Sequence, residues 1–199
     1  MSITIAPKDM AEYELKAKSG IKINSVVYPS FSWGDSLNDK EPSPRKVAII
    51  GNGADKFTIV GAERAKRQIQ AILTWGQPVS VISGHSPMGG VDIWAEEIAD
   101  LMEIPLDLKV PDTHEWNPDE GYGYRARNID IATDCTEIHI IVAREYPFAY
   151  RGRRFSYCYH CVDNESRDCK GHVKSGACWT ANQAQKLGKY PSYYSISNR

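Results

Sequence analysis

The sequence predicts an α/β protein in which a parallel sheet lies between two layers of helices. Two observations lead to this fold class. From Lys46 onward, short apolar segments alternate with longer segments in which apolar residues recur at the helical spacing. Turns that contain glycine follow the apolar segments, as in Gly51-Asn52-Gly53. Strands that alternate with helices form crossover units, and such units place neighbouring strands parallel to one another.

Five short segments are predicted to form the strands. They are Val47–Ile50, Val79–Ser83, Pro105–Val110, Ile138–Ala143 and Tyr190–Ile196. The first is an unbroken apolar run that ends in a glycine turn, which is typical of a buried strand. His139 lies inside the fourth, so we expect it to be a core histidine whose hydrogen bonds are satisfied.

Four segments are predicted to be helical. They are Ile59–Trp75, Val91–Met102, Asn128–Thr133 and Ala177–Leu187. In the second, the apolar residues lie on one stripe and the glutamates lie off it, as on a helix that packs against a sheet. The last helix is expected to stop at Gly188, because glycine commonly terminates helices.

Residues 1–45 do not share this alternation and are predicted to form an irregular N-terminal arm. The arm contains a candidate short helix, Ala11–Lys18, and a polar stretch with prolines, Asn38–Arg45. Residues 46–199 then make one three-layer, Rossmann-like domain with a cysteine-rich insert over residues 150–178. A chain of 199 residues is long enough for one sizeable core.

The composition is that of an ordinary globular protein, with 42% hydrophobic and 25% charged residues. The net charge of −1 disfavours nucleic acid as a partner, because no overall basic field would attract it. The N-terminus lacks the features of a signal peptide, and no apolar stretch approaches the roughly 18 residues of a membrane span. We therefore expect a cytoplasmic protein without a membrane partner. Assembly into a homo-oligomer is left open.

Four of the five cysteines lie within the cysteine-rich insert. Cys158 and Cys161 form one chelating pair, and Cys169 and His172 form a second pair with the same spacing. Two such pairs supply the four ligands of a tetrahedral zinc site, and reduced cytoplasmic thiols favour metal over disulfides. Cys178 competes with Cys169 for the fourth position, because a thiolate is stabilised at a helix start. The insert is thus predicted to be a zinc knuckle that fixes structure.

Parallel sheets of this kind bind ligands outside the carboxyl ends of their strands. Loops rich in glycine and polar residues follow four of the predicted strands, at Gly51–Lys56, Ser83–Gly90, Asp112–Asn128 and Arg144–Cys178. The glycines that end the second loop would let backbone amides approach an anion, although glycine also simply permits a sharp turn. The guanidinium groups of Arg125 and Arg127 suit phosphate, and the alternative is that they are surface arginines around a helix cap made by Asn128.

Three motifs, in this order, resemble the SLOG superfamily. They are GHSPMGGVD at residues 84–92, RNIDIATDCTEIHIIVA at residues 127–143, and KSGAC at residues 174–178. The sequence is most similar to the YspA-like proteins, which are related to the lysine-decarboxylase-like and DprA domains. The resemblance covers roughly residues 46–196. It implies a Rossmannoid sheet that binds nucleotides or nucleotide-derived ligands. The matching positions are Gly89, Gly90, Asp92, Arg127, Asn128, Ser175 and Gly176.

The function expected from these features is binding of a nucleotide-like small molecule, as a sensor or carrier. The expected ligand residues are Gly51, Asn52, Gly53, Gly84, His85, Gly89, Gly90, Asp92, Arg127, Asn128, Lys174, Ser175 and Gly176. Three aromatic residues could stack on a base or simply pack a long loop, namely Trp116, Tyr122 and Tyr124.

Two alternatives are open. One is hydrolysis of an N-glycosidic or phosphate bond in such a ligand. The phosphoribohydrolases that resemble this chain use a glutamate near the last helix, and here Asn182 and Gln183 stand in the corresponding turn, where neither can act as a general base. No catalytic residue is assigned. The other alternative is a nucleic-acid-interacting module that uses the knuckle and the basic stretch Arg151–Arg154.

Overall fold

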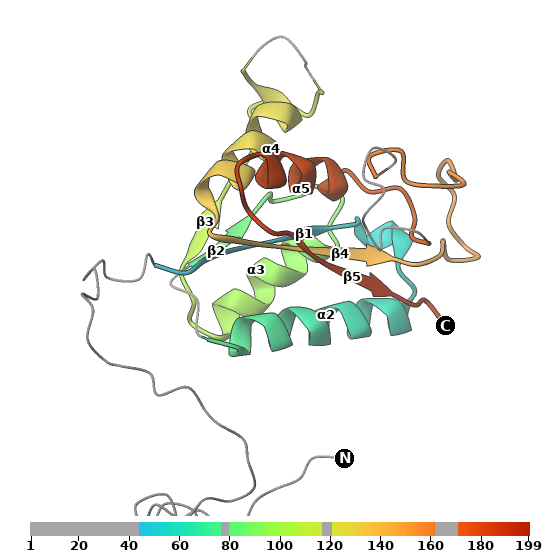
Figure 1. Cartoon of the computed structure of the whole chain (residues 1–199). Coiled ribbons are helices and arrows are strands. Elements are labelled where there is room, and N and C mark those ends of the chain that lie inside the picture. Colours follow the sequence, from blue (N-terminus) through green and yellow to red (C-terminus); the bar gives the residue numbers. More distant parts are fainter. Residues whose placement is uncertain (1–43, 77–79, 117–120, 162–170) are drawn as a thin grey trace, which may run out of the picture. The chain divides into compact units, whose positions relative to one another are not determined.

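The computed structural model describes residues 44–76, 80–116, 121–161 and 171–199. Nearly all of the predicted N-terminal arm lies outside these residues, and so does Cys169. The described part of the chain is an open sheet of five parallel strands with helices on both faces (Figure 1), which confirms the predicted fold class. No helix in these ranges has the length and apolar character that crossing a membrane requires.

The strands are β1 (Lys46–Gly51), β2 (Ser80–Ser83), β3 (Leu106–Leu108), β4 (Glu137–Ala143) and β5 (Ser192–Ile196). They lie in the order β3-β2-β1-β4-β5, and every neighbouring pair is parallel. Strands β2 and β3 therefore lie on one side of β1, and β4 and β5, which come later in the chain, lie on the other side. The order reverses between β1 and β4. Open α/β sheets bind ligands at such a switch point.

A short 3-10 turn and four α-helices connect the strands. They are η1 (Ala54–Lys56), α2 (Ile59–Thr74), α3 (Val91–Leu101), α4 (Gly123–Asp134) and α5 (Ala177–Lys186). Helices α2 and α3 cover one face of the sheet, and α4 and α5 cover the other (Figure 1). In β1, Val47 and Ile49 pack with the first pair of helices, whereas Ala48 and Ile50 pack with the second. Since burying one isoleucine side chain contributes about 1.5–3 kcal/mol, a strand that is apolar on both faces is stabilised by both layers.

Helix α4 begins earlier than the sequence predicts. It was expected to open at Asn128, but it begins at Gly123, and Asn128 is buried in its middle. Gly123 has a φ of +75°, and the N–H of Tyr124 donates to the carbonyl oxygen of Glu115 at 3.0 Å. A glycine turn held by the preceding loop therefore starts the helix, and the interpretation of Asn128 as a helix cap is wrong.

His139 in β4 is a core residue, as predicted. Its side chain is buried, and its two ring nitrogens lie 3.2 Å from the Tyr194 hydroxyl and 3.4 Å from the Glu137 carboxylate. Burial lowers the pKa of His139, which favours the neutral ring. This histidine is therefore explained by packing and needs no functional role.

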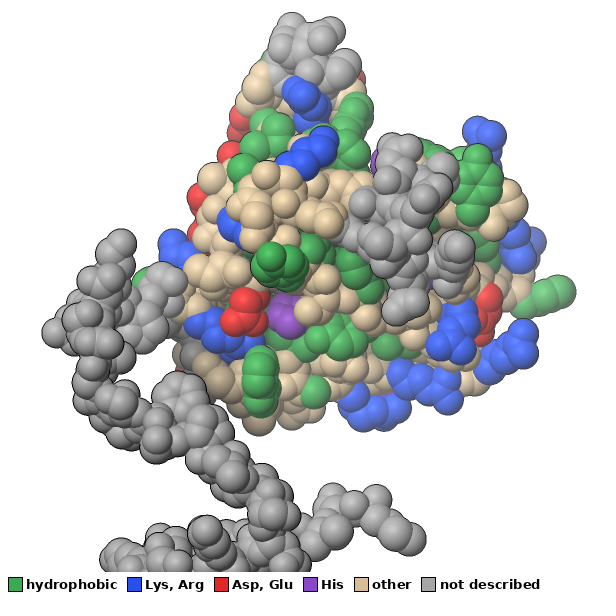
Figure 2. Space-filling view, in the orientation of Figure 1, with side chains coloured by type: hydrophobic (Ala, Val, Ile, Leu, Met, Phe, Trp, Pro, Cys, Tyr) green, Lys and Arg blue, Asp and Glu red, His purple; other side chains and the backbone are tan. Residues whose placement is uncertain are grey.

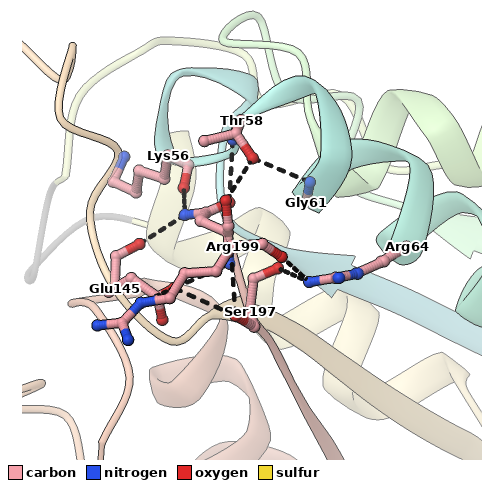
Figure 3. Close-up of polar contacts among 8 residues, drawn as sticks. Lys56, Thr58, Gly61, Arg64, Glu145, Ser197 and Arg199 are labelled. Carbon is pink, nitrogen blue, oxygen red and sulfur yellow. Dashed lines mark hydrogen bonds and ion pairs between the residues drawn. The ribbon is translucent and has the colours of Figure 1, made fainter.

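The last residues of the chain lock the turn that precedes α2 (Figure 3). The buried side chain of Asn198 donates to the carbonyl oxygens of Lys56 at 2.9 Å and Glu145 at 2.6 Å. It also accepts a hydrogen bond from the N–H of Thr58 at 2.9 Å. Thr58 in turn caps α2, because its hydroxyl accepts from the N–H of Gly61 at 3.0 Å. This network fixes the backbone of Lys56 at the carboxyl edge of the sheet.

Candidate functional site

Four side chains that can ligate a metal meet beside the first turn of α5. The ligand atoms of Cys158, Cys161, His172 and Cys178 all lie within 4.8 Å of one another. The Nε2 atom of His172 is 3.6 Å from Sγ of Cys161 and 3.8 Å from Sγ of Cys178. Three thiols and one imidazole at these distances can hold one metal ion. Of the two candidates for the fourth ligand, Cys178 belongs to the cluster, whereas Cys169 lies outside the described residues.

The surrounding backbone orients these ligands. The N–H of Cys161 donates to the carbonyl oxygen of Cys158 at 3.0 Å, which closes the turn between the two thiols. Nδ1 of His172 lies 2.7 Å from the carbonyl oxygen of Val173, so it carries the proton and leaves the Nε2 lone pair for a metal. Hydrogen bonds from the thiols of Cys161 and Cys178 hold the pKa of Cys158 well below its usual range. The thiolate is the form that binds metal.

The cluster joins the insert to the core of the domain. Cys178 is fully buried in the first turn of α5, so one ligand comes from a helix that packs on the sheet. One turn further along, Asn182 donates to the carbonyl oxygen of His160 at 2.6 Å. The N–H of Ser175 lies 3.5 Å from Sγ of Cys158 and donates to it. The insert is thus fastened to the start of α5 rather than forming an isolated knuckle.

A pocket of about 240 Å³ lies between α4 and the start of α5, and we call it the α4 pocket. Aromatic and apolar side chains make part of its wall, and polar side chains make the rest. Its lining residues are Ile50, Gly51, Ser86, Asp92, Trp116, Tyr124, Arg127, Asn128, Ile131, Gly176, Ala177 and Thr180. The ring of Trp116 packs edge-on against Trp179 of α5, with their centroids 4.7 Å apart. The α4 pocket therefore contains an aromatic ring, that of Trp116, which is positioned by Trp179 and lies beside hydrogen-bonding groups.

Asp92 is a buried acid in the α4 pocket, at the start of α3. One of its carboxylate oxygens accepts from the N–H of Gly51 at 3.2 Å. Burial raises the pKa of Asp92 from 3.8 to about 6, although the positive charge of Arg127 opposes the shift. The Arg127 guanidinium donates to the carbonyl oxygen of Gly84, and its Nε has no hydrogen-bond partner among the described residues. A carboxyl that titrates near neutral pH in a pocket marks a candidate ligand contact.

A second pocket, of about 220 Å³, lies between η1 and the segment that follows β4, and we call it the insert pocket. Its lining residues are Gly51, Asn52, Gly53, Lys56, Tyr146, Tyr150, Arg153, Phe155, Lys174, Ser175 and Gly176. Three of them are cationic, and none is acidic. Figure 2 shows Lys and Arg side chains gathered on the side of the molecule where the strands end and this segment lies. The insert pocket is therefore suited to an anion.

The two pockets share the lining residues Gly51 and Gly176, so they lie next to each other, and we call the two together the cleft. Gly176 immediately precedes α5, and a Cβ atom at this position would meet nothing within 4 Å. The start of a helix attracts anions, and here it lies where the pockets join. The buried Asn52 side chain donates to the carbonyl oxygen of Lys174 at 3.1 Å and accepts from the N–H of Ala143 at 3.0 Å. These two hydrogen bonds connect the segment around Lys174, which lines the cleft, to the end of β4 beside the switch point.

Nine of the thirteen predicted ligand residues line the cleft. They are Gly51, Asn52, Gly53, Asp92, Arg127, Asn128, Lys174, Ser175 and Gly176. Gly84, His85, Gly89 and Gly90 line neither pocket. His85 instead lies 2.9 Å from the Glu96 carboxylate through its Nδ1. Gly90 has a φ of +88°, and a Cβ there would lie 2.3 Å from the carbonyl oxygen of Asn52. Close packing of two loops therefore explains the glycine at position 90.

Five lining residues of the insert pocket were not among the predicted ligand residues. They are Lys56, Tyr146, Tyr150, Arg153 and Phe155. They come from a 3-10 turn and an irregular segment, neither of which has a periodic pattern that sequence reasoning can use. The available signal was the density of basic and aromatic residues between positions 144 and 159. Within that stretch, Arg153 lines the pocket and Arg154 donates to the carbonyl oxygens of Pro147 and Phe148.

No protein family model, curated protein or solved structure matches the chain. The function is therefore inferred from the chemistry of the cleft and of the Cys/His cluster.

Proposed function

We propose that the cleft binds a nucleotide or nucleotide-derived small molecule, and that the protein is a sensor or carrier of this ligand. The main support is position, because the two pockets meet at the switch point of a parallel sheet, beside the start of α5. The aromatic and polar wall of the α4 pocket suits a base and a sugar. The motif order that resembles SLOG proteins supports the same class of ligand.

Gly176→Val tests the cleft without disturbing the fold. Gly176 has ordinary helical angles, with φ of −64° and ψ of −27°, and open space beside it. A valine should therefore fold normally and project into the place where the pockets meet. We expect nucleotides to raise the melting temperature of the parent protein, because they bind the folded state, and to lose this effect in the variant. The matched control is Gly121→Val, since position 121 also has open space and lines neither pocket. A nucleotide shift that survives Gly176→Val would contradict the assignment.

A second candidate function is hydrolysis of an N-glycosidic or phosphate bond in the bound ligand. The observation that favours it is Asp92, whose carboxyl lies in the α4 pocket with a pKa of about 6. Such a group exchanges protons near neutral pH, as a general base must. Incubation with nucleotides, followed by chromatography for free base and phosphate, separates the two functions. A hydrolase should release product in the parent protein and none in Asp92→Asn, whereas a sensor should leave the nucleotide intact in both.

We propose that the metal held by Cys158, Cys161, His172 and Cys178 is zinc, in a structural role. Three thiolates and one imidazole form a closed four-ligand set of the kind that structural zinc sites use. The cytoplasm, which we propose as the compartment, would keep these thiols reduced. Elemental analysis should find about one zinc per chain, and Cys178→Ser should lose it. The control is Cys135→Ser, because Cys135 is buried outside the cluster. Full metal content in Cys178→Ser would refute this ligand set.

A further inference from the structure

We infer that the cleft is built for a nucleoside polyphosphate, with the base and sugar in the α4 pocket and the phosphate chain in the insert pocket. This inference rests on the proposed function, because it names the class of nucleotide and its orientation in the same cleft. The main evidence for this inference is the difference in charge between the two pockets.

The charges of the α4 pocket compensate one another, whereas those of the insert pocket do not. The α4 pocket is lined by one acid, Asp92, and one base, Arg127. The insert pocket is lined by Lys56, Arg153 and Lys174, and by no carboxylate. A ligand that fills both pockets should therefore be neutral at one end and carry several negative charges at the other. A nucleoside with a chain of phosphates has this distribution of charge.

Aromatic rings, rather than carboxylates, hold two of these cations in place. The guanidinium of Arg153 lies 4.9 Å from the centre of the Phe155 ring. The ammonium of Lys174 lies 5.4 Å from the same ring and 5.0 Å from that of Tyr159. Neither side chain forms an ion pair with a carboxylate among the described residues. Their positive charge therefore remains available to a ligand, because a ring face positions a cation without neutralising it.

Lys56, which belongs to η1, is the third cation that lines the insert pocket. Its ammonium lies 5.6 Å from the centre of the Tyr150 ring and 3.2 Å from the Asp55 carboxylate, which offsets part of its charge. The backbone carbonyl oxygen of Lys56 accepts a hydrogen bond from Asn198, so the hydrogen bonds of Asn198, which we call the C-terminal network, fix the backbone of Lys56. Three cations from η1, the segment after β4 and the loop before α5 thus surround one cavity. A chain of two or three phosphate groups can contact more of these cations than a single phosphate can.

The order of the parts along the cleft follows from its shared residues. The pockets meet at Gly51 and Gly176, at the start of α5, where the first phosphate would accept from backbone N–H groups. The base would then lie toward the rings of Trp116 and Tyr124, and the sugar toward Asp92. The further phosphates would extend toward Arg153 and its neighbours.

Calorimetric titration with adenosine, AMP, ADP and ATP, and with the guanosine series, tests this orientation in metal-replete protein without added magnesium. We expect affinity to rise by about a hundredfold from the monophosphate to the diphosphate, because two charge-assisted contacts of about tenfold each are added. Arg153→Ala and Lys174→Ala should each weaken diphosphate binding by about tenfold and leave nucleoside binding unchanged. Trp116→Ala should weaken the nucleoside and the diphosphate alike. The matched control is Arg151→Ala, since Arg151 is exposed and lines neither pocket.

The possible results distinguish a failure of the proposed function from a failure of this inference. If neither nucleosides nor nucleotides bind at all, the proposed function is wrong and this inference is wrong with it. If nucleotides bind with the same affinity whatever their number of phosphates, and Arg153→Ala behaves like the control, the proposed function stands and the inference is overturned. If inorganic tripolyphosphate binds as tightly as the triphosphates, the α4 pocket contributes nothing and the orientation is overturned.

Discussion

At the scale of single residues, the ionisation of Asp92 makes the stability of the protein depend on pH. Its carboxyl is buried at the start of α3, beside the N–H of Gly51 and near the charge of Arg127. Burial is the largest effect, and it raises the pKa from 3.8 to about 6. The folded protein therefore holds a proton on Asp92 between these pH values, where the unfolded chain has released it. By linkage, the contribution of Asp92 to stability is largest below pH 4 and decreases as the pH rises toward 6.

Asp92→Asn should remove this pH dependence. The amide keeps an oxygen for the N–H of Gly51 and does not ionise. Relative to the parent protein, the unfolding free energy of the variant should increase by about 2 kcal/mol between pH 4.5 and 7.5. Denaturant titrations at both pH values measure the difference, and any effect of pH on the metal site cancels because both proteins contain it. Asp100→Asn is the control, since Asp100 is exposed on the same helix. Equal pH dependence in Asp92→Asn and in the parent protein would refute the raised pKa.

Single residues also show what the sequence could and could not predict. The histidine inside an apolar strand was correctly interpreted, because a buried strand leaves His139 few alternatives to satisfied core packing. The role of Gly90 was not predictable, because a glycine that permits a turn and a glycine that approaches a ligand look the same in a sequence. Its neighbour is the backbone of Asn52 from a loop some forty residues away, which becomes visible only in three dimensions.

At the scale of elements, the segment from β5 to the C-terminus positions the start of α2 and, through Lys56, one wall of the cleft. Asn198 donates to two carbonyl oxygens and accepts from one N–H, and its own carbonyl oxygen accepts from the Thr58 hydroxyl at 2.9 Å. Gly61 gives this side chain room, since a Cβ at position 61 would lie 2.1 Å from the Oδ1 atom of Asn198. The turn before α2 therefore depends on a residue far away in the sequence.

Asn198→Ala should destabilise the fold by about 1–3 kcal/mol, because it removes three hydrogen bonds made by a buried side chain and leaves two part-buried carbonyl oxygens without these donors. The expected result is a lower midpoint of denaturant unfolding with an unchanged slope. The exposed Ser195 of β5 provides the matched control, and Ser195→Ala should unfold at nearly the parent midpoint. Loss of stability by the same amount in both variants would show that the C-terminal network has no special role.

The elements with a strong pattern were predicted well, and those without one were not. The apolar strands and the striped helix that became α3 were found within a few residues of their observed ends. Helix α4 was placed five residues too late, because its first turn, Gly123 to Arg127, has few apolar residues and is held by a distant carbonyl. The pairing of Cys178 with the knuckle was left open, since spacing alone cannot show that a helix start folds back onto an insert.

At the scale of the whole molecule, the metal cluster and the cleft share one segment of chain. His172 and Cys178 belong to the Cys/His cluster, and residues 174–176 between them line the cleft. The sulfur of Cys158 also accepts a hydrogen bond from the backbone N–H of Ser175 at 3.5 Å. A metal on these ligands would hold the cleft wall in one conformation before a ligand arrives. Such preorganisation increases affinity, because less ordering remains to occur on binding.

Metal removal should therefore weaken nucleotide binding even though the metal does not touch the nucleotide. Coupling between two sites is typically about 1–3 kcal/mol, so we expect chelator-treated protein to bind ADP roughly fivefold or more weakly, and added zinc to restore the affinity. Coupling is reciprocal, and ADP should raise the affinity for zinc by the same factor, which competition with a zinc-binding dye measures. Circular dichroism must show that the metal-free protein is still folded. Equal ADP affinity with and without metal, in folded protein, would mean that hydrogen bonds such as those of Asn52 hold the segment alone. A weaker ADP affinity in folded, metal-free protein would instead show that the cluster and the cleft are coupled, and the equal effect of ADP on zinc affinity checks that both titrations report the same coupling free energy.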